Sequence, residues 1–313
     1  DVGGYHYKWR QYVPDHEKFP ERIIVGTESY PLEAFENWQA VLDNPYVIGD
    51  FVWTSWDYLG ETGLGNAVLD NEPSANSLPW FNAFSGDIDL CGFKKPQFYY
   101  REVIWGESLI NMAVHAPIPE GRRESVSAWG WPDERQSWTW PGSEGRALDV
   151  TVYSSCTSVR LELDGKEIAT QPVNEKMIAR FKVPYQPGEL RAVGLSSDGT
   201  PVANTSLRTA GEPAAIRLTA DRSTIRVDRN DLAYVTVEIV DEHGEVVPSA
   251  EVPVRFVVGG AGELAATGSG SPNDAASFQQ PLRKTWRGRC QAILRPRGAA
   301  GTITLEAEVD GLK

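Results

Sequence analysis

The chain has 313 residues, 41% of them hydrophobic, and includes 11 tryptophans, 29 glycines and 21 prolines. This length predicts two or three domains, and the many glycines and prolines predict numerous turns between short strands. The net charge of −13 excludes a typical nucleic-acid-binding protein, which needs clustered Lys and Arg, and no apolar stretch reaches the roughly 18 residues that a membrane span requires.

The first third of the chain, residues 1–106, alternates strand and helix. Strands are predicted at 2–7, 23–27 and 47–53, and helices at 32–42 and from Pro96. The helix at 32–42 has one apolar face, formed by Leu32, Phe35, Trp38, Val41 and Leu42. That pattern gives at most three strand–helix units, whereas a closed (β/α)8 barrel needs eight units and about 250 residues. We therefore expect residues 1–106 to be the C-terminal part of a (β/α)8 TIM barrel.

From residue 107 onward the pattern changes to short alternating strands. They are predicted at 149–153, 158–163, 177–183 and 189–195, with Asp164-Gly165 and Asp198-Gly199 as turns. A similar series follows at 215–220, 233–240, 252–258 and 302–309, after a joint at Glu212-Pro213. We expect two all-β immunoglobulin-like sandwiches, at 107–211 and 212–313.

The candidate site lies where two predicted strands end. Glu28 follows an apolar β-branched run and precedes Pro31, and the next strand ends in an aromatic cluster that begins at Trp53. Carboxyl ends of neighbouring parallel strands meet at one rim, so the carboxylate should lie beside the tryptophan. Aromatic faces bind pyranose rings, and carboxylates act as nucleophile or acid/base, so the pattern favours sugar chemistry. The alternatives are that Glu28 is an ordinary surface acid and that Trp53 is a core tryptophan.

Further candidates flank these two residues. Trp56 and Asp57 are candidates for recognising sugar hydroxyls, although Asp57 is equally suited to cap a helix or turn. Strand alternation would put Tyr5 and Tyr7 on the same side at the end of the first strand. A tyrosine hydroxyl near Glu28 would donate a hydrogen bond that keeps the carboxylate ionised, and ordinary aromatic packing is the alternative.

The cysteines and the first residues of the chain give less information about bound metals and the cellular compartment. Cys91, Cys156 and Cys290 are far apart with no CxxC pair, so neither a zinc site nor a disulfide framework is indicated. No signal peptide is visible, and the opening residues read as the inside of a strand. The sequence does not decide the cellular compartment, and a periplasmic or secreted bacterial location is favoured over a cytoplasmic one.

Several segments together resemble glycoside hydrolase family 2, in its bacterial β-galactosidase-like branch. They are GTESYP at 26–31, GDFVWTSWDYLGE at 49–61, FSGDIDLCGF at 84–93, WTWPG at 138–142, LELDGK at 161–166 and IRLTAD at 216–221. The resemblance implies a retaining exo-glycosidase acting on a β-linked oligosaccharide or glycoside. No His/Asp/Glu spacing in the sequence is typical of a metal site, and we expect neither a metal nor a cofactor. The resemblance also implies that Glu28 is the nucleophile, Tyr7 its hydrogen-bond partner and Trp53 the wall of the sugar subsite.

One family feature is missing from the expected place. The acid/base of the family is the Glu of an Asn-Glu pair upstream of the nucleophile, about 5 Å from it in space. This sequence has Asn-Glu only downstream, at Asn71-Glu72 and Asn174-Glu175, which we interpret as coincidences. We therefore expect this chain to be a C-terminal portion that is inactive alone and that exposes apolar surface and strand edges. Its expected partners are the missing N-terminal part of the enzyme and a second copy of the protein in a homo-oligomer.

Two alternatives remain at this point. A β-glucuronidase or β-mannosidase of the same family is the nearer one, although a uronic-acid enzyme would need cationic groups that the named rim residues do not supply. The other is a non-catalytic carbohydrate-binding or scaffold protein, which would use Trp129, Trp131, Trp138 and Trp140 as its sugar platform.

Overall fold

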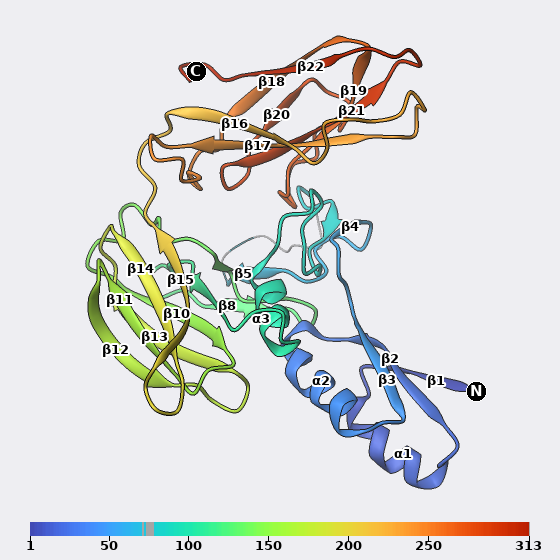
Figure 1. The fold of residues 1–313 in the computed structure, drawn as a ribbon, viewed down its shortest axis with the longest axis vertical. Helices are drawn as coiled ribbons and strands as arrows, with labels where there is room; N and C mark the ends of the chain where they lie inside the picture. The colour runs from blue at the N-terminus through green and yellow to red at the C-terminus, as the bar shows by residue number, and fades with distance from the viewer. Residues whose placement is uncertain (71, 73–77, 313) are drawn as a thin grey trace. The chain divides into compact units, whose positions relative to one another are not determined.

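The computed structural model describes residues 1–70, 72 and 78–312. The chain divides into two compact units (Figure 1). The first unit is Asp1–Asp89 with Lys94–Leu207, and the second is Leu90–Phe93 with Arg208–Lys313. Within the described ranges, no helix is both long and apolar enough to cross a membrane.

The first unit begins with a three-stranded parallel sheet. Its strands are β1 (Val2–His6), β2 (Ile23–Ser29) and β3 (Val47–Val52), hydrogen-bonded in the order β1-β2-β3. The connections carry η1 (Trp9–Gln11) with α1 (Tyr12–Lys18), and η2 (Pro31–Glu33) with α2 (Ala34–Asp43). The three strands and the second connection agree with the prediction from sequence, whereas α1 was not predicted.

The predicted apolar face of the helix at 32–42 needs a correction. Leu32 and Leu42 were placed on that face, but both side chains are exposed. The first turn, Pro31–Glu33, is a 3₁₀ helix with about three residues per turn, so Leu32 is rotated away from the face that Phe35 and Trp38 form. Leu42 lies in the last turn of α2, whereas Val41 packs against the cluster of Tyr12, Ile24 and Val47.

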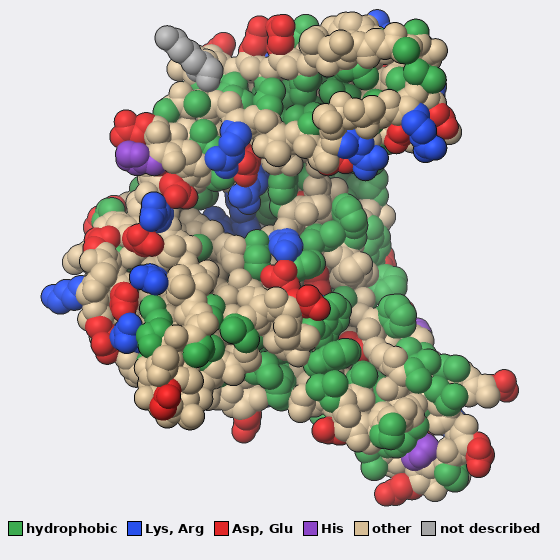
Figure 2. Space-filling view, in the orientation of Figure 1, with side chains coloured by type: hydrophobic (Ala, Val, Ile, Leu, Met, Phe, Trp, Pro, Cys, Tyr) green, Lys and Arg blue, Asp and Glu red, His purple; other side chains and the backbone are tan. Residues whose placement is uncertain are grey.

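Helices α1 and α2 cover one face of the parallel sheet (Figure 1). Tyr12, Ile24 and Val47 form the buried core between them. Alternation along the strands, together with a register shift in β3 between Val47 and Asp50, turns other side chains to the opposite face. There Val2 is 54% exposed, Ile48 61% and Phe51 64%, and Figure 2 shows hydrophobic side chains gathered over this part of the unit. The structure thus confirms the expected exposed apolar surface.

Helix α3 (Pro96–Ile104) connects the parallel sheet to the rest of the first unit. Pro96 occupies its first turn, where a missing N–H costs no hydrogen bond. Tyr100, Val103 and Ile104 form one buried cluster with Ala34 of α2 and with Tyr153. Through this cluster the parallel sheet and the β-sandwich that contains Tyr153 form one unit.

Besides two short strand pairs, β4 (Tyr58–Leu59) with β6 (Asn82–Ala83) and β5 (Ala67–Leu69) with β8 (Glu124–Val126), the rest of this unit contains two antiparallel four-stranded sheets. One has the order β13-β10-β7-β9 and the other β12-β11-β14-β15. Their bounds are β7 (Ile110–His115), β9 (Glu134–Arg135), β10 (Ala147–Ser154), β11 (Ser158–Leu163), β12 (Lys166–Pro172), β13 (Ile178–Pro184), β14 (Glu189–Leu195) and β15 (Pro201–Arg208). A single apolar core with Trp138 at full burial lies between the two sheets, which is the arrangement of a β-sandwich.

The second unit is also built from two antiparallel sheets. They have the orders β16-β17-β21-β19 and β20-β18-β22 and enclose one core. Their bounds are β16 (Ala215–Ala220), β17 (Ala233–Val240), β18 (Pro253–Gly260), β19 (Gly262–Gly268), β20 (Leu282–Lys284), β21 (Arg289–Pro296) and β22 (Ile303–Glu308). The short segment Leu90–Phe93 belongs to this unit, where the Gln291 side chain donates to the carbonyl of Cys91 at 3.1 Å.

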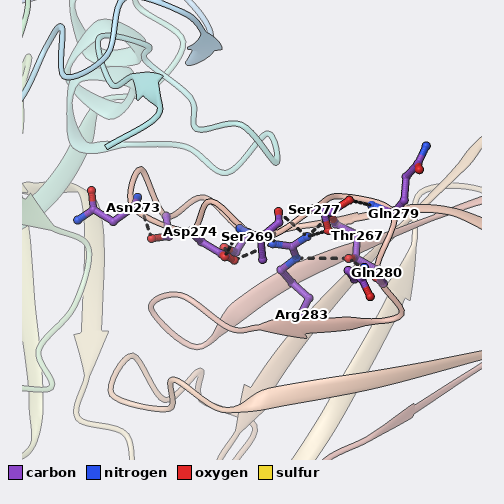
Figure 3. A network of polar contacts seen from close by, with 10 residues as sticks. Thr267, Ser269, Asn273, Asp274, Ser277, Gln279, Gln280 and Arg283 are labelled. Atoms are coloured by element: carbon purple, nitrogen blue, oxygen red, sulfur yellow. Dashed lines mark hydrogen bonds and ion pairs between the residues drawn. The ribbon is translucent and has the colours of Figure 1, made fainter. Parts of the chain in front are cut away.

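A buried arginine fixes the long loop between β19 and β20 in the second unit. Arg283 is only 1% exposed, and its Nη1 donates to Asp274 Oδ2 at 2.7 Å (Figure 3). Its Nη2 donates to the carbonyls of Ser277 at 2.7 Å and Thr267 at 3.1 Å. Because Arg presents several donors in a rigid planar fork, one side chain holds both ends of this loop.

Candidate active site

Glu28 lies near the end of β2 and is held through both carboxylate oxygens. The Tyr7 hydroxyl donates to Oε2 at 2.8 Å, and Nε2 of His6 lies 3.2 Å from Oε1. The side chain is partly exposed, which leaves it open to approach from outside the unit. The structure therefore brings together the two residues, Glu28 and Tyr7, that the sequence analysis paired.

Tyr7 reaches Glu28 because the backbone turns sharply after β1. Its φ of 52° lies in the left-handed region, which is uncommon for a residue with a side chain. The register of β1 against β2 also shifts between Tyr5 and His6. The prediction that alternation puts Tyr5 and Tyr7 on the same side is therefore wrong: Tyr5 points toward α1, where its hydroxyl donates to Asp15 at 2.8 Å.

The Tyr7 hydroxyl is held from a second direction by Trp129. Nε1 of Trp129 donates to the Tyr7 oxygen at 2.7 Å, and the Tyr7 ring stacks on Tyr30 with centroids 4.2 Å apart. Burial raises the pKa of Tyr7 above its ordinary value, the Trp129 hydrogen bond opposes this, and the contact with Glu28 adds to it. Tyr7 is therefore protonated at neutral pH and acts as a donor.

His6 completes the set of donors around Glu28. Its Nδ1 lies 2.6 Å from the Thr27 hydroxyl, while Nε2 faces Glu28. An ionised carboxylate only accepts hydrogen bonds, so Nε2 carries the proton in this contact. With neutral imidazole, the Thr27 hydroxyl then donates to Nδ1 and so selects the tautomer.

The end of β3 forms the other side of the site. The backbone N–H of Trp53 donates to the carbonyl of Ser29 at 3.0 Å, directly after Glu28, so the two strand ends do meet. The Trp53 indole donates to the Tyr58 hydroxyl at 3.2 Å, and that hydroxyl in turn donates to Glu61. Burial, the Glu61 contact and the charge on Glu28 raise the pKa of Tyr58 to about 12.

Trp56 and Asp57 differ in accessibility. The Trp56 side chain is exposed, whereas Asp57 is only 2% exposed. Asp57 Oδ1 accepts from Lys95 Nζ at 2.9 Å and from the Gly86 N–H at 2.7 Å. Burial raises the pKa of Asp57 to about 6 while Lys95 works against that rise, and burial lowers the pKa of Lys95. The Asp57 carboxylate thus anchors the loop that carries Trp53 and does not face the rim.

Backbone hydrogen bonds hold the same loop against a later segment. Thr54 N–H donates to Ser85, Asp87 N–H donates back to Thr54, and Ile88 N–H donates to Ser55, at 3.0 to 3.2 Å. The peptide bond between Trp53 and Thr54 is cis. This pairing brings residues 54–55 and 85–88, which are distant in sequence, together beside Trp53.

The remaining sequence candidates lie elsewhere. Asn71 lies outside the described residues, and Glu72 accepts the N–H of Leu69 at 2.9 Å. Asn174 and Glu175 form a turn between β12 and β13 in the sandwich of the first unit. In the described part of the chain, no three His, Cys, Asp or Glu side chains are grouped closely enough to hold a metal ion.

The four tryptophans of the alternative sugar platform do not form one surface. Trp138 and Trp140 are buried in the sandwich core, and the Trp131 indole donates to Glu134 at 2.8 Å. Only Trp129 contacts the site described here, through Tyr7. Sequence reasoning missed Trp129 and His6 as site residues, because their contacts depend on the turn at Tyr7 and on a pairing 122 residues apart.

Comparisons with known proteins agree with the resemblance. A model described as glycoside hydrolase family 2 C-terminal domain 5 matches residues 216–313, and a model of a domain of unknown function (DUF4982) matches residues 145–203. The β-galactosidase BoGH2A of Bacteroides ovatus is 30% identical over 281 residues, which cover 89% of this chain and 29% of that protein. A β-glucuronidase of Formosa agariphila is 24% identical over 330 residues, covering 97% of this chain and 31% of that protein.

The solved structures include a close structural match. A glycosyl hydrolase family 2 member from Bacteroides cellulosilyticus superposes with a TM-score of 0.92 at 36% identity, covering 100% of this chain and 41% of that one. The chain thus spans well under half the length of the relatives it matches. From these matches we conclude that the chain belongs to glycoside hydrolase family 2 and corresponds to a C-terminal portion of its members.

Proposed function

We propose that this chain is part of a retaining exo-β-galactosidase in which Glu28 is the nucleophile. The observation that carries the proposal is the carboxylate at the end of β2, with hydrogen-bond donors on both oxygens from Tyr7 and His6. Such contacts fix the orientation of a carboxylate and favour its ionised form, as nucleophilic attack requires. Trp53, at the end of the neighbouring strand, would support the sugar ring, and the exposed Trp56 would contact the sugar or the leaving group.

The reaction would proceed in two displacements. In the first, a Glu28 oxygen bonds to the anomeric carbon as the glycosidic C–O bond breaks, and a second carboxylic acid protonates the leaving oxygen. In the second, water deprotonated by that same group attacks the anomeric carbon and releases Glu28, with net retention. The second acid would come from a part of the longer enzyme outside this chain, so the isolated chain should be inactive.

The architecture that fits this role is the C-terminal part of a (β/α)8 barrel at 1–106, followed by immunoglobulin-like sandwiches at 107–211 and 212–313. The parallel order β1-β2-β3 with helices on one face supports the barrel. The missing N-terminal strands would cover the opposite face, where Val2, Ile48 and Phe51 are exposed. The N-terminal part is therefore the first partner we assign to the chain, and a homo-oligomer the second.

A β-glucuronidase is the second candidate, because a relative of that name is similar over 97% of this chain. It would need cationic groups at the carboxylate of the sugar, and the rim residues Glu28, Tyr7 and Trp53 supply none. A panel of aryl β-galactoside, β-glucuronide and β-mannoside substrates separates these specificities.

The test uses the full-length protein and its Glu28→Gln variant. We expect hydrolysis of the aryl β-galactoside and a loss of about 10⁴-fold or more in kcat in the variant, because removing a nucleophile removes the covalent route. Glu33→Gln is the matched control, since Glu33 lies five residues later and instead accepts hydrogen bonds from Trp9 and Arg10. Full activity of Glu28→Gln would overturn the proposal.

A further inference from the structure

A segment between β7 and β9 of the first unit's sandwich reaches the proposed nucleophile indirectly. The Trp129 indole N–H donates to the Tyr7 oxygen at 2.7 Å, and the Tyr7 hydroxyl donates to Glu28 at 2.8 Å. The Trp129 ring also meets the rings of Tyr7 and Tyr30 edge-on, at centroid distances of 6.1 and 5.6 Å. Trp129 thus contacts Tyr7 through both its hydrogen bond and its ring.

The position of this segment is fixed by the loop that follows β3. Strand β8 (Glu124–Val126) pairs with β5 (Ala67–Leu69), and the Ser127 N–H donates to the carbonyl of Asn66 at 2.9 Å. Gly130 approaches the same carbonyl so closely that a Cβ there would lie 2.7 Å from its oxygen. The backbone on both sides of Trp129 is therefore tied to the loop that also carries Trp53 at its start.

The Tyr7 side chain needs a contact from outside its own strand to fix its direction. The left-handed backbone of Tyr7, with φ of 52°, is disfavoured for a residue with a Cβ. The hydrogen bond from Tyr7 N–H to the carbonyl of Glu28 at 2.8 Å holds the backbone, but the ring direction depends on the neighbours. A donor on the phenolic oxygen also polarises its O–H, which strengthens the hydrogen bond that this O–H donates.

We propose that Trp129 is a positioning residue for the nucleophile: it aligns the Tyr7 hydroxyl with Glu28 and strengthens the hydrogen bond between them. This role rests on the function proposed above and extends the site to a residue that lies beyond the strand–helix part of the chain. Trp129 touches neither Glu28 nor the sugar in this role and acts only through Tyr7.

The test is a double-mutant cycle in the full-length enzyme, with an aryl β-galactoside whose glycosylation step limits kcat. Trp129→Phe keeps an aromatic ring but removes the N–H, so we expect kcat to fall roughly five- to tenfold with KM unchanged. In the Tyr7→Phe background the same substitution should change kcat less than twofold, because the hydroxyl through which it acts is gone.

Trp131→Phe is the matched control. It removes an indole hydrogen bond of similar length, to Glu134, two residues along the same segment, and should leave kcat within twofold of wild type. A second variant, Gly130→Ala, displaces the segment without changing Trp129. It should lower kcat in the wild-type background and not in the Tyr7→Phe background, so the proposal stays testable if Trp129→Phe does not fold.

The outcomes separate the two proposals. Equal losses from Trp129→Phe in both backgrounds, or an unchanged kcat in the wild-type background, would overturn the role of Trp129 and leave the nucleophile proposal standing. Absence of glycosidase turnover in the wild-type full-length protein would instead overturn the proposed function, and the role of Trp129 with it.

Discussion

Each oxygen of Glu28 has its own donor, and the two donors differ in kind. Tyr7 donates from a phenol whose pKa is raised by burial, so its proton is retained over the physiological range. His6 donates from an imidazole whose other nitrogen contacts Thr27. Tyr7 should therefore donate at every pH in the physiological range. Because His6 is exposed and Tyr7 is partly buried, we expect removal of the His6 side chain to be better tolerated than removal of the Tyr7 hydroxyl.

Substitution of His6 tests its contribution. We expect His6→Ala to lower kcat/KM of the full-length enzyme about tenfold, because one donor to the nucleophile is lost. His6→Gln keeps an N–H of similar reach and should retain most of the activity. His16→Ala, which removes a ring stacked on Tyr46, is the control. Equal activity of His6→Ala and wild type, measured as kcat/KM, would contradict a role for this contact.

At the residue scale the sequence predicted Glu28, Tyr7 and Trp53 and a hydrogen bond from a tyrosine to Glu28, but not the backbone turn that brings Tyr7 there. Glu28 was visible because an apolar run ends beside it, and such periodicity is a local signal. Tyr7 was placed by resemblance, whereas strand alternation predicted the wrong relation to Tyr5. That error arose because the chain leaves the β conformation at Tyr7, and the residue types beside Tyr7 do not predict a turn there.

At the scale of elements, Asp57 shows how a polar residue in a functional motif can serve the loop itself. Its position after Trp53 suggested contact with a sugar, but its carboxylate is buried on Lys95 and Gly86. Lys95 lies 38 residues later, beside α3, so the partner could not be found from spacing. By contrast, β13 and β17 were predictable because their residues alternate inward and outward. Other sandwich strands, among them β7, β12, β15, β19 and β21, were not predicted.

The buried arginine of the second unit gives a prediction at this scale. We expect Arg283→Met to lower the free energy of unfolding of the second unit by about 3 kcal/mol, because Asp274 and the carbonyls of Thr267 and Ser277 lose their donor. The measurement is urea unfolding of the 313-residue chain, followed by the shift of the midpoint. Arg255→Met, on the exposed side of neighbouring β18, is the control and should shift it little. A neutral Arg283→Met would show that the loop is held by other contacts.

At the scale of the whole molecule, the parallel sheet has one covered and one open face. Sheets of parallel strands are normally buried on both faces. The chain spans 29% of BoGH2A and 41% of the Bacteroides cellulosilyticus structure, so these relatives contain additional chain that can supply such a cover. We expect the exposed side chains of β1 and β3 to be buried in the longer protein.

Phe51→Ser tests this expectation in two contexts. Phe51 is 64% exposed in this chain, so the substitution should change the stability of the 313-residue chain by less than about 1 kcal/mol. In the full-length protein it should cost about 2 kcal/mol or more, because a buried aromatic side chain is lost. Leu42→Ser, on the exposed side of α2, should have the same small effect in both. Equal effects of Phe51→Ser in the two proteins, by thermal or urea unfolding, would argue against a cover on this face.

The most direct measurement of the central claim is the identity of the carboxylate that becomes covalently glycosylated. The full-length enzyme is treated with an activated 2-deoxy-2-fluoro-β-galactoside, which slows the second displacement, and peptic peptides are mapped by mass spectrometry. We predict one equivalent of fluoroglycosyl label on Glu28, in step with loss of activity. Label on another carboxylate, such as Glu61, or turnover of the parent glycoside with inverted configuration, would contradict the assignment of Glu28 as nucleophile.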